Sequence, residues 1–352
     1  MISNATYSIK HINEIKRKYN KLDPQVIERT IFAFGLLEAL VKVGTPFIFK
    51  GGTCLMLILE NPYRLSTDID IMVDPDCDID PYLNEAAKIY PFKSREEQIR
   101  IGKNGIVKRH FKFYYDSLYS EIELSILLDV LYEKNNYHKT IFKEIKMEFL
   151  ITEGDNLKVV TPSAESILGD KLTAFAPNTT GIEYYEIDKN DEKIDKTIQV
   201  IKQFFDCAQL VKEVENFKEV LETYKNIHKL EKEYRGIDKS FEECLMDTFN
   251  ASLSIYTRGK ILPDQYKYLL SGIQKIQNHI YGINFNSITA HKNACDVMLI
   301  CAILLKDIES IDIEEQRIFR NKKLGPVNKM RKIDQQSFNK AATAIRLLEI
   351  DK

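Results

Sequence analysis

Two aspartates separated by one residue are the first candidates for chemistry in this chain of 352 residues. Asp68 and Asp70 flank Ile69 in an apolar run that continues to Val73. Alternate residues of a β-strand point to the same face, so both carboxylates would project together. Close carboxylates repel each other unless a cation joins them, and Mg²⁺ bound to substrate phosphates is such a cation. The pair is therefore a candidate metal site, although an isolated Asp-x-Asp also occurs on many solvated strand edges.

A glycine turn precedes these aspartates. Lys50-Gly51-Gly52-Thr53 follows the short apolar segment 47–49 and precedes a second one, 54–59, which we expect to be a helix. Glycines let a backbone approach a ligand closely, and the unpaired N–H groups at a helix start suit a phosphate. The segment is not a Walker loop, because no Gly-Lys-Ser/Thr follows at the required spacing. Taken alone, it could be only a turn.

A third carboxylate is expected on the next long strand, residues 121–131, where Glu123 and Asp129 share one face. Six residues of strand span about 20 Å, too far for both to contact ions about 3.5–4 Å apart. Asp129 lies between Leu128 and Val130, whereas Glu123 lies beside a polar turn. The free-energy cost of an unpaired charge is therefore higher at Asp129 than at Glu123. We therefore expect Asp129 to complete the site.

Four motifs in this order resemble the AbiEii/AbiGii toxin family of nucleotidyltransferases, within the DNA polymerase β-like superfamily. The first is the glycine turn, and the second is Arg64-x-Ser66-x-Asp68-x-Asp70. The third is the segment 169–175, which contains Lys171, and the fourth is the segment 202–206, which ends in Asp206. The resemblance covers residues 30–215 and implies a fold, a reaction and a set of site residues.

The implied reaction transfers a nucleoside monophosphate from a nucleoside triphosphate to an acceptor hydroxyl. The resemblance implies Mg²⁺ or Mn²⁺ held by three carboxylates, those of Asp68, Asp70 and Asp129, the last also accepting the hydroxyl proton. The residues implied to bind the triphosphate are Lys50, Gly51, Gly52, Thr53, Arg64, Ser66 and Lys171. Asp206 is included with the catalytic residues.

The resemblance also implies the toxin of a bacterial toxin–antitoxin pair with a role in phage defence. A tRNA 3′ end is the implied acceptor, and a cognate antitoxin is an implied partner. Two alternatives remain open at this point. One is a nucleotidyltransferase that modifies a protein or a small molecule, and the other is a nucleotide-binding regulator without turnover.

The two later motifs also have simpler interpretations. Lys171 lies in an apolar helix and needs an anion partner to stay charged, which a triphosphate would provide. An ordinary exposed lysine is the alternative. Asp206 could instead pair with Lys202 four residues earlier. The polar segment 177–181 that follows is either a substrate-facing loop or a connection.

Hydrophobic periodicity and end signals predict an α/β (α+β) fold, with strands and helices in residues 1–190, followed by a mainly helical domain, residues 191–352. The resemblance implies that the first domain is a nucleotidyltransferase-type mixed sheet with helices. Asp23 can cap a helix that begins at Pro24 and ends at Gly44. Strands are expected at 47–49, 69–73, 111–115 and 121–131, and further helices at 161–175, 198–211 and 294–305.

Composition limits the remaining functions. Fifty Lys and Arg against 52 Asp and Glu exclude a polycation, so any RNA surface must be local. The stretches 93–112 and 317–332 each hold seven basic residues, and either could bind RNA phosphates or be a solvated face.

Six cysteines without C-x-x-C spacing indicate a reducing cytoplasm, and the dispersed histidines make a zinc site improbable. We expect no membrane association, because the longest apolar run, Val297 to Leu305, is only nine residues long, about half a membrane span. We also expect no secretion signal, because residues 1–6 include no apolar h-region.

Overall fold

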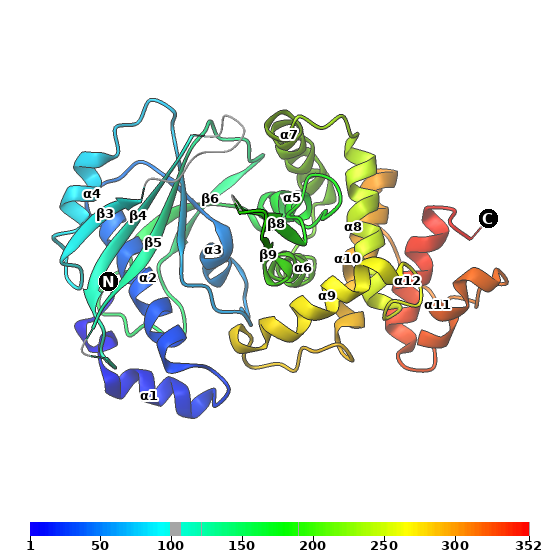
Figure 1. Ribbon diagram of the computed structural model, residues 1–352, viewed down its shortest axis with the longest axis horizontal. Helices are drawn as coiled ribbons and strands as arrows, with labels where there is room; N and C mark the ends of the chain where they lie inside the picture. The colour runs from blue at the N-terminus through cyan, green and yellow to red at the C-terminus, as the bar shows by residue number, and fades with distance from the viewer. Residues whose placement is uncertain (99–106, 121, 189, 352) are drawn as a thin grey trace. The chain divides into compact units, whose positions relative to one another are not determined.

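The computed structural model describes residues 1–98, 107–120, 122–188 and 190–351, which form two compact units (Figure 1). The first unit comprises Met1–Ser163 and Asn278–Ile283, and the second comprises Ala164–Gln277 and Asn284–Lys352. The segment 164–190, which the sequence analysis assigned to the first domain, lies in the second unit. The mixed α/β fold class is confirmed.

The first unit is built on a mixed five-stranded sheet with the order β1-β2-β5-β4-β3. Strands β2 and β5 are parallel, and the other neighbours are antiparallel. The strands are β1 (Ile48–Lys50), β2 (Ile69–Val73), β3 (Ser94–Gln98), β4 (Lys108–Asp116) and β5 (Glu123–Tyr132). A separate antiparallel pair consists of β6 (Thr140–Glu144) and β7 (Lys158–Pro162).

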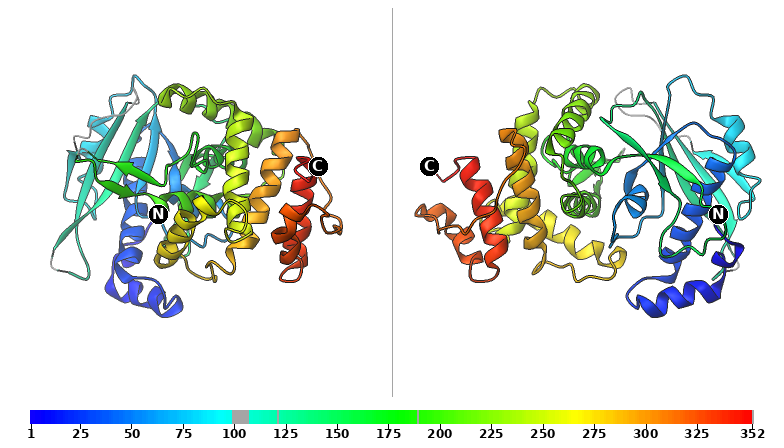
Figure 2. Two further views of the ribbon diagram at one scale, coloured as in Figure 1. Left: turned by 45° about the vertical axis from the view of Figure 1, so that its right-hand side comes forward. Right: turned by 180° about the vertical axis from the view of Figure 1, so that it is seen from behind.

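The helices of the first unit are α1 (Ile9–Lys18), α2 (Pro24–Lys42), α3 (Gly51–Ile58) and α4 (Asp80–Ala86), and the unit begins with the short 3₁₀ turn η1 (Asn4–Thr6). Helix α2 begins as predicted, because the side chain of Asp23 accepts a hydrogen bond from the backbone N–H of Gln25. The ring of Phe32 on α2 stacks on Tyr115 of β4, with the centroids 3.8 Å apart. Helix α2 therefore covers one face of the sheet (Figures 1 and 2).

The two faces of the sheet differ in burial. Residues that alternate along the central strands are buried, including Ile69 and Ile71 on β2 and Leu128 and Val130 on β5. The residues between them, such as Asp70, are only half-buried. This alternation separates a core face, which packs on α2, from a polar face that carries the candidate site.

The second unit is mainly helical. Its helices are α5 (Ala164–Ala174), α6 (Thr197–Leu210), α7 (Phe217–Arg235), α8 (Phe241–Tyr256), α9 (Pro263–Lys275), α10 (Ala290–Lys306), α11 (Gly325–Met330) and α12 (Gln335–Leu347). It also contains the hairpin β8 (Tyr185–Ile187) and β9 (Lys193–Asp195) and the 3₁₀ turn η3 (Lys322–Leu324), while the turn η2 (Ile276–His279) spans a junction of the two units. Helix α10 lies between α8 and α12 (Figure 2). No helix among the described residues is both long and apolar enough to cross a membrane.

One short segment was predicted as the wrong type of element. Thr161 and Pro162 were expected to open a helix, but they end strand β7, where they pair with Ile141 and Thr140 of β6. Helix α5 begins two residues later, at Ala164. Pairing with a strand about 20 residues away overrides the local helix-start signal of a proline.

Candidate active site

The glycine turn brings the first two motifs into contact. Gly51, the first residue of α3, has φ +80°, a conformation that L side chains rarely adopt. A Cβ atom built on Gly51 would lie 2.0 Å from Oδ2 of Asp70. A Cβ atom built on Gly52 would lie 2.7 Å from Nη2 of Arg64 and 2.9 Å from Oγ of Ser66. Both glycines are therefore required for the close approach of these three polar side chains.

The segment that carries the second motif is fixed by two contacts. The hydroxyl of Thr53, on α3, donates a hydrogen bond to the carbonyl of Asp68 at 2.5 Å. Arg64 forms a backbone bridge with Ile280, and the N–H of Leu65 donates to the carbonyl of His279 at 2.9 Å. The segment Asn278–Ile283, distant in sequence, thus helps to place the second motif. Sequence reasoning missed this role, because no local pattern in that segment indicates it.

A row of charged and polar residues crosses the polar face of the sheet. The strand register places Lys50 opposite Asp70, Asp70 opposite Asp129, and Asp129 opposite His110. Residues in register share one face, and adjacent strands lie about 4.8 Å apart. The carboxylates of Asp70 and Asp129 are therefore neighbours. Their role as metal ligands stays a prediction.

The other two candidate acids lie outside this row. Asp68 immediately precedes β2, rather than lying within it, and is exposed. Glu123 pairs with Asp116 at the opposite end of β5 from Asp129. The register thus places Glu123 far from Asp70, and the choice of Asp129 as the third ligand stays a prediction.

His110 is a polar residue of the site that the sequence analysis missed. Its Nδ1 lies 2.7 Å from Oδ1 of Asp129. The His110 side chain is 15% exposed and that of Asp129 is 37% exposed. The predicted strand 111–115 began one residue too late to include His110, and only the register between β4 and β5 reveals the contact.

The donor set fits a magnesium-type ion that shares its ligands with a nucleotide. Asp70 and Asp129 provide hard carboxylate oxygens on one face, and the exposed Asp68 lies beside them in the chain. Within the part of the chain that the structure describes, no group of three or more His, Cys, Asp or Glu residues could hold a metal ion. A divalent ion would therefore need phosphate oxygens or water to complete its coordination, as Mg²⁺ commonly does.

The third and fourth motifs meet within the second unit. Lys171 on α5 and Asp206 on α6 form an ion pair, with Nζ 3.1 Å from Oδ2. The same Nζ donates to Oε1 of Gln203 at 3.0 Å. The anion partner expected for Lys171 is thus provided by Asp206, and the interpretation as an exposed lysine is wrong. The catalytic roles of Lys171 and Asp206 stay predictions.

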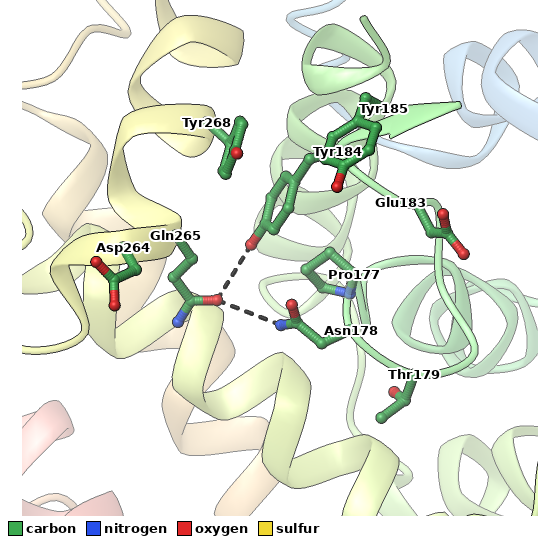
Figure 3. Close-up of a pocket in the computed structure, with 9 residues that line it drawn as sticks. All are labelled: Pro177, Asn178, Thr179, Glu183, Tyr184, Tyr185, Asp264, Gln265 and Tyr268. Atoms are coloured by element: carbon green, nitrogen blue, oxygen red, sulfur yellow. Dashed lines mark hydrogen bonds between the residues drawn. The ribbon is translucent and has the colours of Figure 1, made fainter. Parts of the chain in front are cut away.

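The polar segment after α5 forms one wall of a pocket of about 450 Å³ (Figure 3). The lining residues are Pro177, Asn178, Thr179, Glu183, Tyr184, Tyr185, Asp264, Gln265 and Tyr268. Asn178 Nδ2 and the hydroxyl of Tyr184 both donate to Oε1 of Gln265, at 3.4 and 3.1 Å. The lining contains two acids and no Lys or Arg, so it is unsuited to a triphosphate. None of the predicted site residues lines this pocket.

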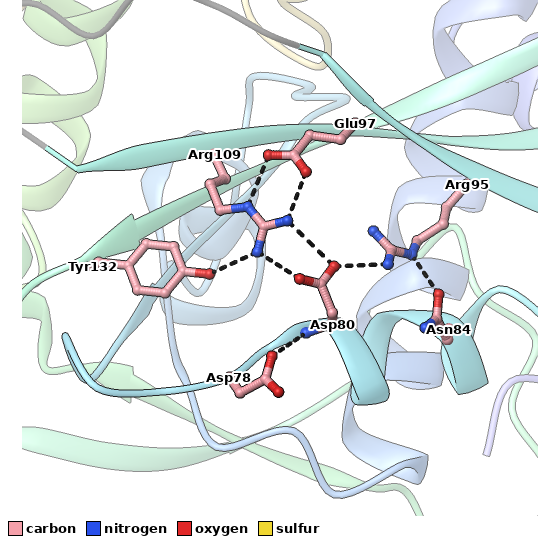
Figure 4. A network of polar contacts seen from close by, with 7 residues as sticks. All are labelled: Asp78, Asp80, Asn84, Arg95, Glu97, Arg109 and Tyr132. Atoms are coloured by element: carbon pink, nitrogen blue, oxygen red, sulfur yellow. Dashed lines mark hydrogen bonds and ion pairs between the residues drawn. The ribbon is translucent and has the colours of Figure 1, made fainter.

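A network of ion pairs occupies the first basic stretch (Figure 4). Asp80 on α4 accepts from Arg95 at 2.7 Å and from Arg109 at 2.8 Å, and Arg109 also donates to Glu97 at 2.6 Å. Hydrogen bonds from Arg109 lower the pKa of both carboxylates below the usual range. Arg95 and Arg109 are therefore engaged by acids, while Arg100 and Lys103 of this stretch lie outside the described residues.

Residues 35–260 match the family described as "Nucleotidyl transferase AbiEii toxin, Type IV TA system". The chain belongs to this family. The matched range contains every predicted site residue of this AbiEii protein, from Lys50 to Asp206. The chain is thus a nucleotidyltransferase that uses a nucleotide substrate, and its toxin–antitoxin family suggests an antitoxin partner.

Two solved structures resemble this AbiEii protein at 15% identity. One is JHP933 from Helicobacter pylori, with a TM-score of 0.44, covering 80% of this chain and 94% of its own. The other is provisionally described as a nucleotidyltransferase from H. pylori, with a TM-score of 0.45, covering 82% of this chain and 99% of its own. No curated protein matches the chain.

Proposed function

We propose that this chain is a metal-dependent nucleotidyltransferase that transfers a nucleoside monophosphate to the 3′ end of tRNA, as the toxin of a phage-defence system. The observation that carries the metal-dependent part is the placement of Asp70 beside both Asp129 and the Gly51 backbone. Such a cluster can hold a divalent ion against the phosphates of a nucleotide that binds at the glycine turn.

In this mechanism the acceptor hydroxyl oxygen forms a bond to the α-phosphorus, and the bond to pyrophosphate breaks. Mg²⁺ or Mn²⁺, when bound, lowers the pKa of the hydroxyl and neutralises phosphate charge. Asp68, Asp70 and Asp129 would hold the ion. Asp129, which lies beside Asp70 in the row, would also accept the hydroxyl proton.

The triphosphate would bind at the turn. The N–H groups of Gly51, Gly52 and Thr53 open helix α3, where no side chain caps the helix start. These N–H groups and the positive end of the helix dipole favour an anion. Arg64 and Ser66 lie against Gly52 and would contact the same phosphates, which stabilises the charge that develops on pyrophosphate.

Three further cations have roles in this proposal. Lys50, in register with Asp70, would contact the nucleotide from the sheet row. Lys171, whose ammonium group pairs with Asp206, would contact the triphosphate as the family resemblance implies. Basic residues in 317–332, of which Lys322, Lys323 and Lys332 are exposed, would bind tRNA phosphates.

The deciding experiment offers labelled nucleoside triphosphates to the purified protein with a panel of tRNAs, proteins and small hydroxyl compounds. Label transfer to tRNA that requires Mg²⁺ or Mn²⁺ supports the proposal. Transfer to a protein or a small molecule instead would overturn the tRNA assignment. Triphosphate binding without release of pyrophosphate would favour the regulator.

A further inference from the structure

His110 lies at one end of the row of charged and polar residues that crosses the sheet, and its ring contacts the carboxylate of Asp129. An ionised carboxylate has only acceptor atoms, so the 2.7 Å contact requires a hydrogen on Nδ1 of His110. The contact engages Oδ1 of Asp129. Among the described residues, the structure shows no partner for Oδ2 of the same carboxylate.

We propose that His110 is a positioning residue for Asp129. Its Nδ1–H holds one carboxylate oxygen, which fixes the side-chain torsions of Asp129 and leaves Oδ2 for a divalent ion beside Asp70. This inference rests on the proposed function, because it takes Asp129 as a ligand of that ion.

The position of the pair on the sheet argues against a purely structural role. Strands β4 and β5 are in register over nine residue pairs, from Lys108–Leu131 to Asp116–Glu123. Their opposite face is closed by buried side chains that include Phe111 and Leu128. The strands therefore do not depend on this half-buried contact to stay paired.

The chemistry of carboxylate ligands explains what the contact contributes. A ligating carboxylate is commonly held by a second hydrogen-bond partner, and losing that partner costs roughly 10–100-fold in metal affinity. Asp129 lies opposite Asp70 in the register of β5 and β2, so its carboxylate must face that of Asp70 if the two are to share one ion. The Nδ1–H of His110, on β4, can hold the Asp129 side chain in that orientation.

The test uses a pair of isosteric substitutions in the full-length protein. Asn at position 110 places an amide nitrogen near the position of Nδ1, and Gln places one near the position of Nε2. Mn²⁺ binding, without nucleotide, is measured by water-proton relaxation enhancement. We expect His110→Asn to remain within a few-fold of wild type and His110→Gln to bind roughly 10–100-fold more weakly. Thermal melting and circular dichroism check that both variants are folded.

A double-mutant cycle decides whether His110 acts through Asp129. Asp129→Asn should weaken Mn²⁺ binding by itself, and His110→Gln should then add little. The same loss from His110→Gln in both backgrounds would overturn the positioning role, as would equal binding by His110→Asn and His110→Gln. Unchanged binding in Asp129→Asn would instead show that the ligand role in the proposed function is wrong.

Discussion

The ammonium group of Lys171 lies 3.1 Å from Oδ2 of Asp206, in side chains that are only 9% and 3% exposed. Such a pair loses hydration on both partners, so its attraction has to offset a large desolvation cost. The pair joins α5 to α6 and links the third and fourth motifs of the family, which the chain places 35 residues apart. Removing one partner leaves an uncompensated buried charge.

We predict that Lys171→Met and Asp206→Leu each destabilise the protein by about 3–5 kcal/mol, whereas the double substitution costs much less than their sum. The reason is that the double variant leaves no buried charge. Denaturant unfolding of the four proteins measures the coupling. Lys212→Gln, at an exposed lysine just beyond the end of α6, is the control and should change stability by less than about 1 kcal/mol. Additive losses would show that Lys171 and Asp206 contribute independently.

The role of Lys171 toward the nucleotide requires a separate measurement. Lys171→Ala should weaken binding of the triphosphate much more than binding of the nucleoside, because the lost contact is to phosphate. Isothermal titration with both ligands tests this prediction in protein shown to be folded. Equal losses for the two ligands would leave Lys171 with the structural role alone.

Substitution of an acid on the sheet should affect the rate of nucleotide transfer according to where that acid lies. Asp70→Asn and Asp129→Asn should each reduce the rate of nucleotide transfer by roughly a hundredfold or more, because they remove oxygens that hold the ion. Glu123→Gln, on the same strand as Asp129, is the matched control and should retain most activity. Initial rates measured over a range of Mn²⁺ concentrations provide the test. Full activity in folded Asp129→Asn, or loss in Glu123→Gln, would reverse the assignment.

Two glycines with positive φ allow the effect of backbone strain to be separated from the effect of a steric clash with Asp70. Gly44 and Gly51 have φ values of +73° and +80°, but only Gly51 has an atom within 4 Å of a built Cβ. Both Gly44→Ala and Gly51→Ala should therefore lose about 1–2 kcal/mol of stability to backbone strain. Gly51→Ala alone should displace Asp70 and abolish nucleotide transfer. Similar activity in the two variants would contradict the close approach at Asp70.

These residues also show how far sequence reasoning could go. Strand β2 was predicted with its exact bounds, because Asp68 and Asp70 alternate with Ile69 and Ile71. Helix α2 was predicted from its own end signals. All these signals are local.

What the sequence analysis missed depends on non-local pairing. The contact of His110 with Asp129 follows from the register between β4 and β5. The partner of Lys171 lies on another helix, and the segment Asn278–Ile283 joins the first unit from more than 100 residues away. Register and helix packing are properties of the folded chain, so no pattern within one segment reports them.

The ion pairs around Asp80 predict a pH dependence of stability. Hydrogen bonds from Arg109, and then from Arg95, lower the folded-state pKa of Asp80 below its unfolded value. The ion pairs therefore contribute fully to the free energy of unfolding when the pH is above about 3.9, the pKa of an aspartate in the unfolded chain. This contribution is lost as the pH falls below that value. Unfolding free energies measured from pH 6 to pH 3 should fall less steeply for Asp80→Asn than for wild type. Asp312→Asn, outside this network, should keep the wild-type slope, and an unchanged slope in Asp80→Asn would contradict the prediction.

The basic stretch 317–332 predicts how the proposed tRNA binding depends on salt. Lys322, Lys323 and Lys332 are exposed, whereas Arg331 is half-buried and contacts Glu315 at 3.1 Å. A cation already paired with a carboxylate releases fewer counterions from RNA when it binds, so its loss should matter less. The logarithm of the tRNA affinity, plotted against the logarithm of the salt concentration, should lose up to about one unit of slope for each exposed lysine changed to Gln.

Two control variants complete this experiment. Arg331→Gln should reduce the slope less than Lys332→Gln, which lies next to it in the chain. Lys10→Gln, an exposed lysine in the first unit, should leave the slope unchanged. An unchanged slope in the triple variant of Lys322, Lys323 and Lys332 would show that this stretch is a solvated basic face, and tRNA would then have to bind elsewhere on the protein.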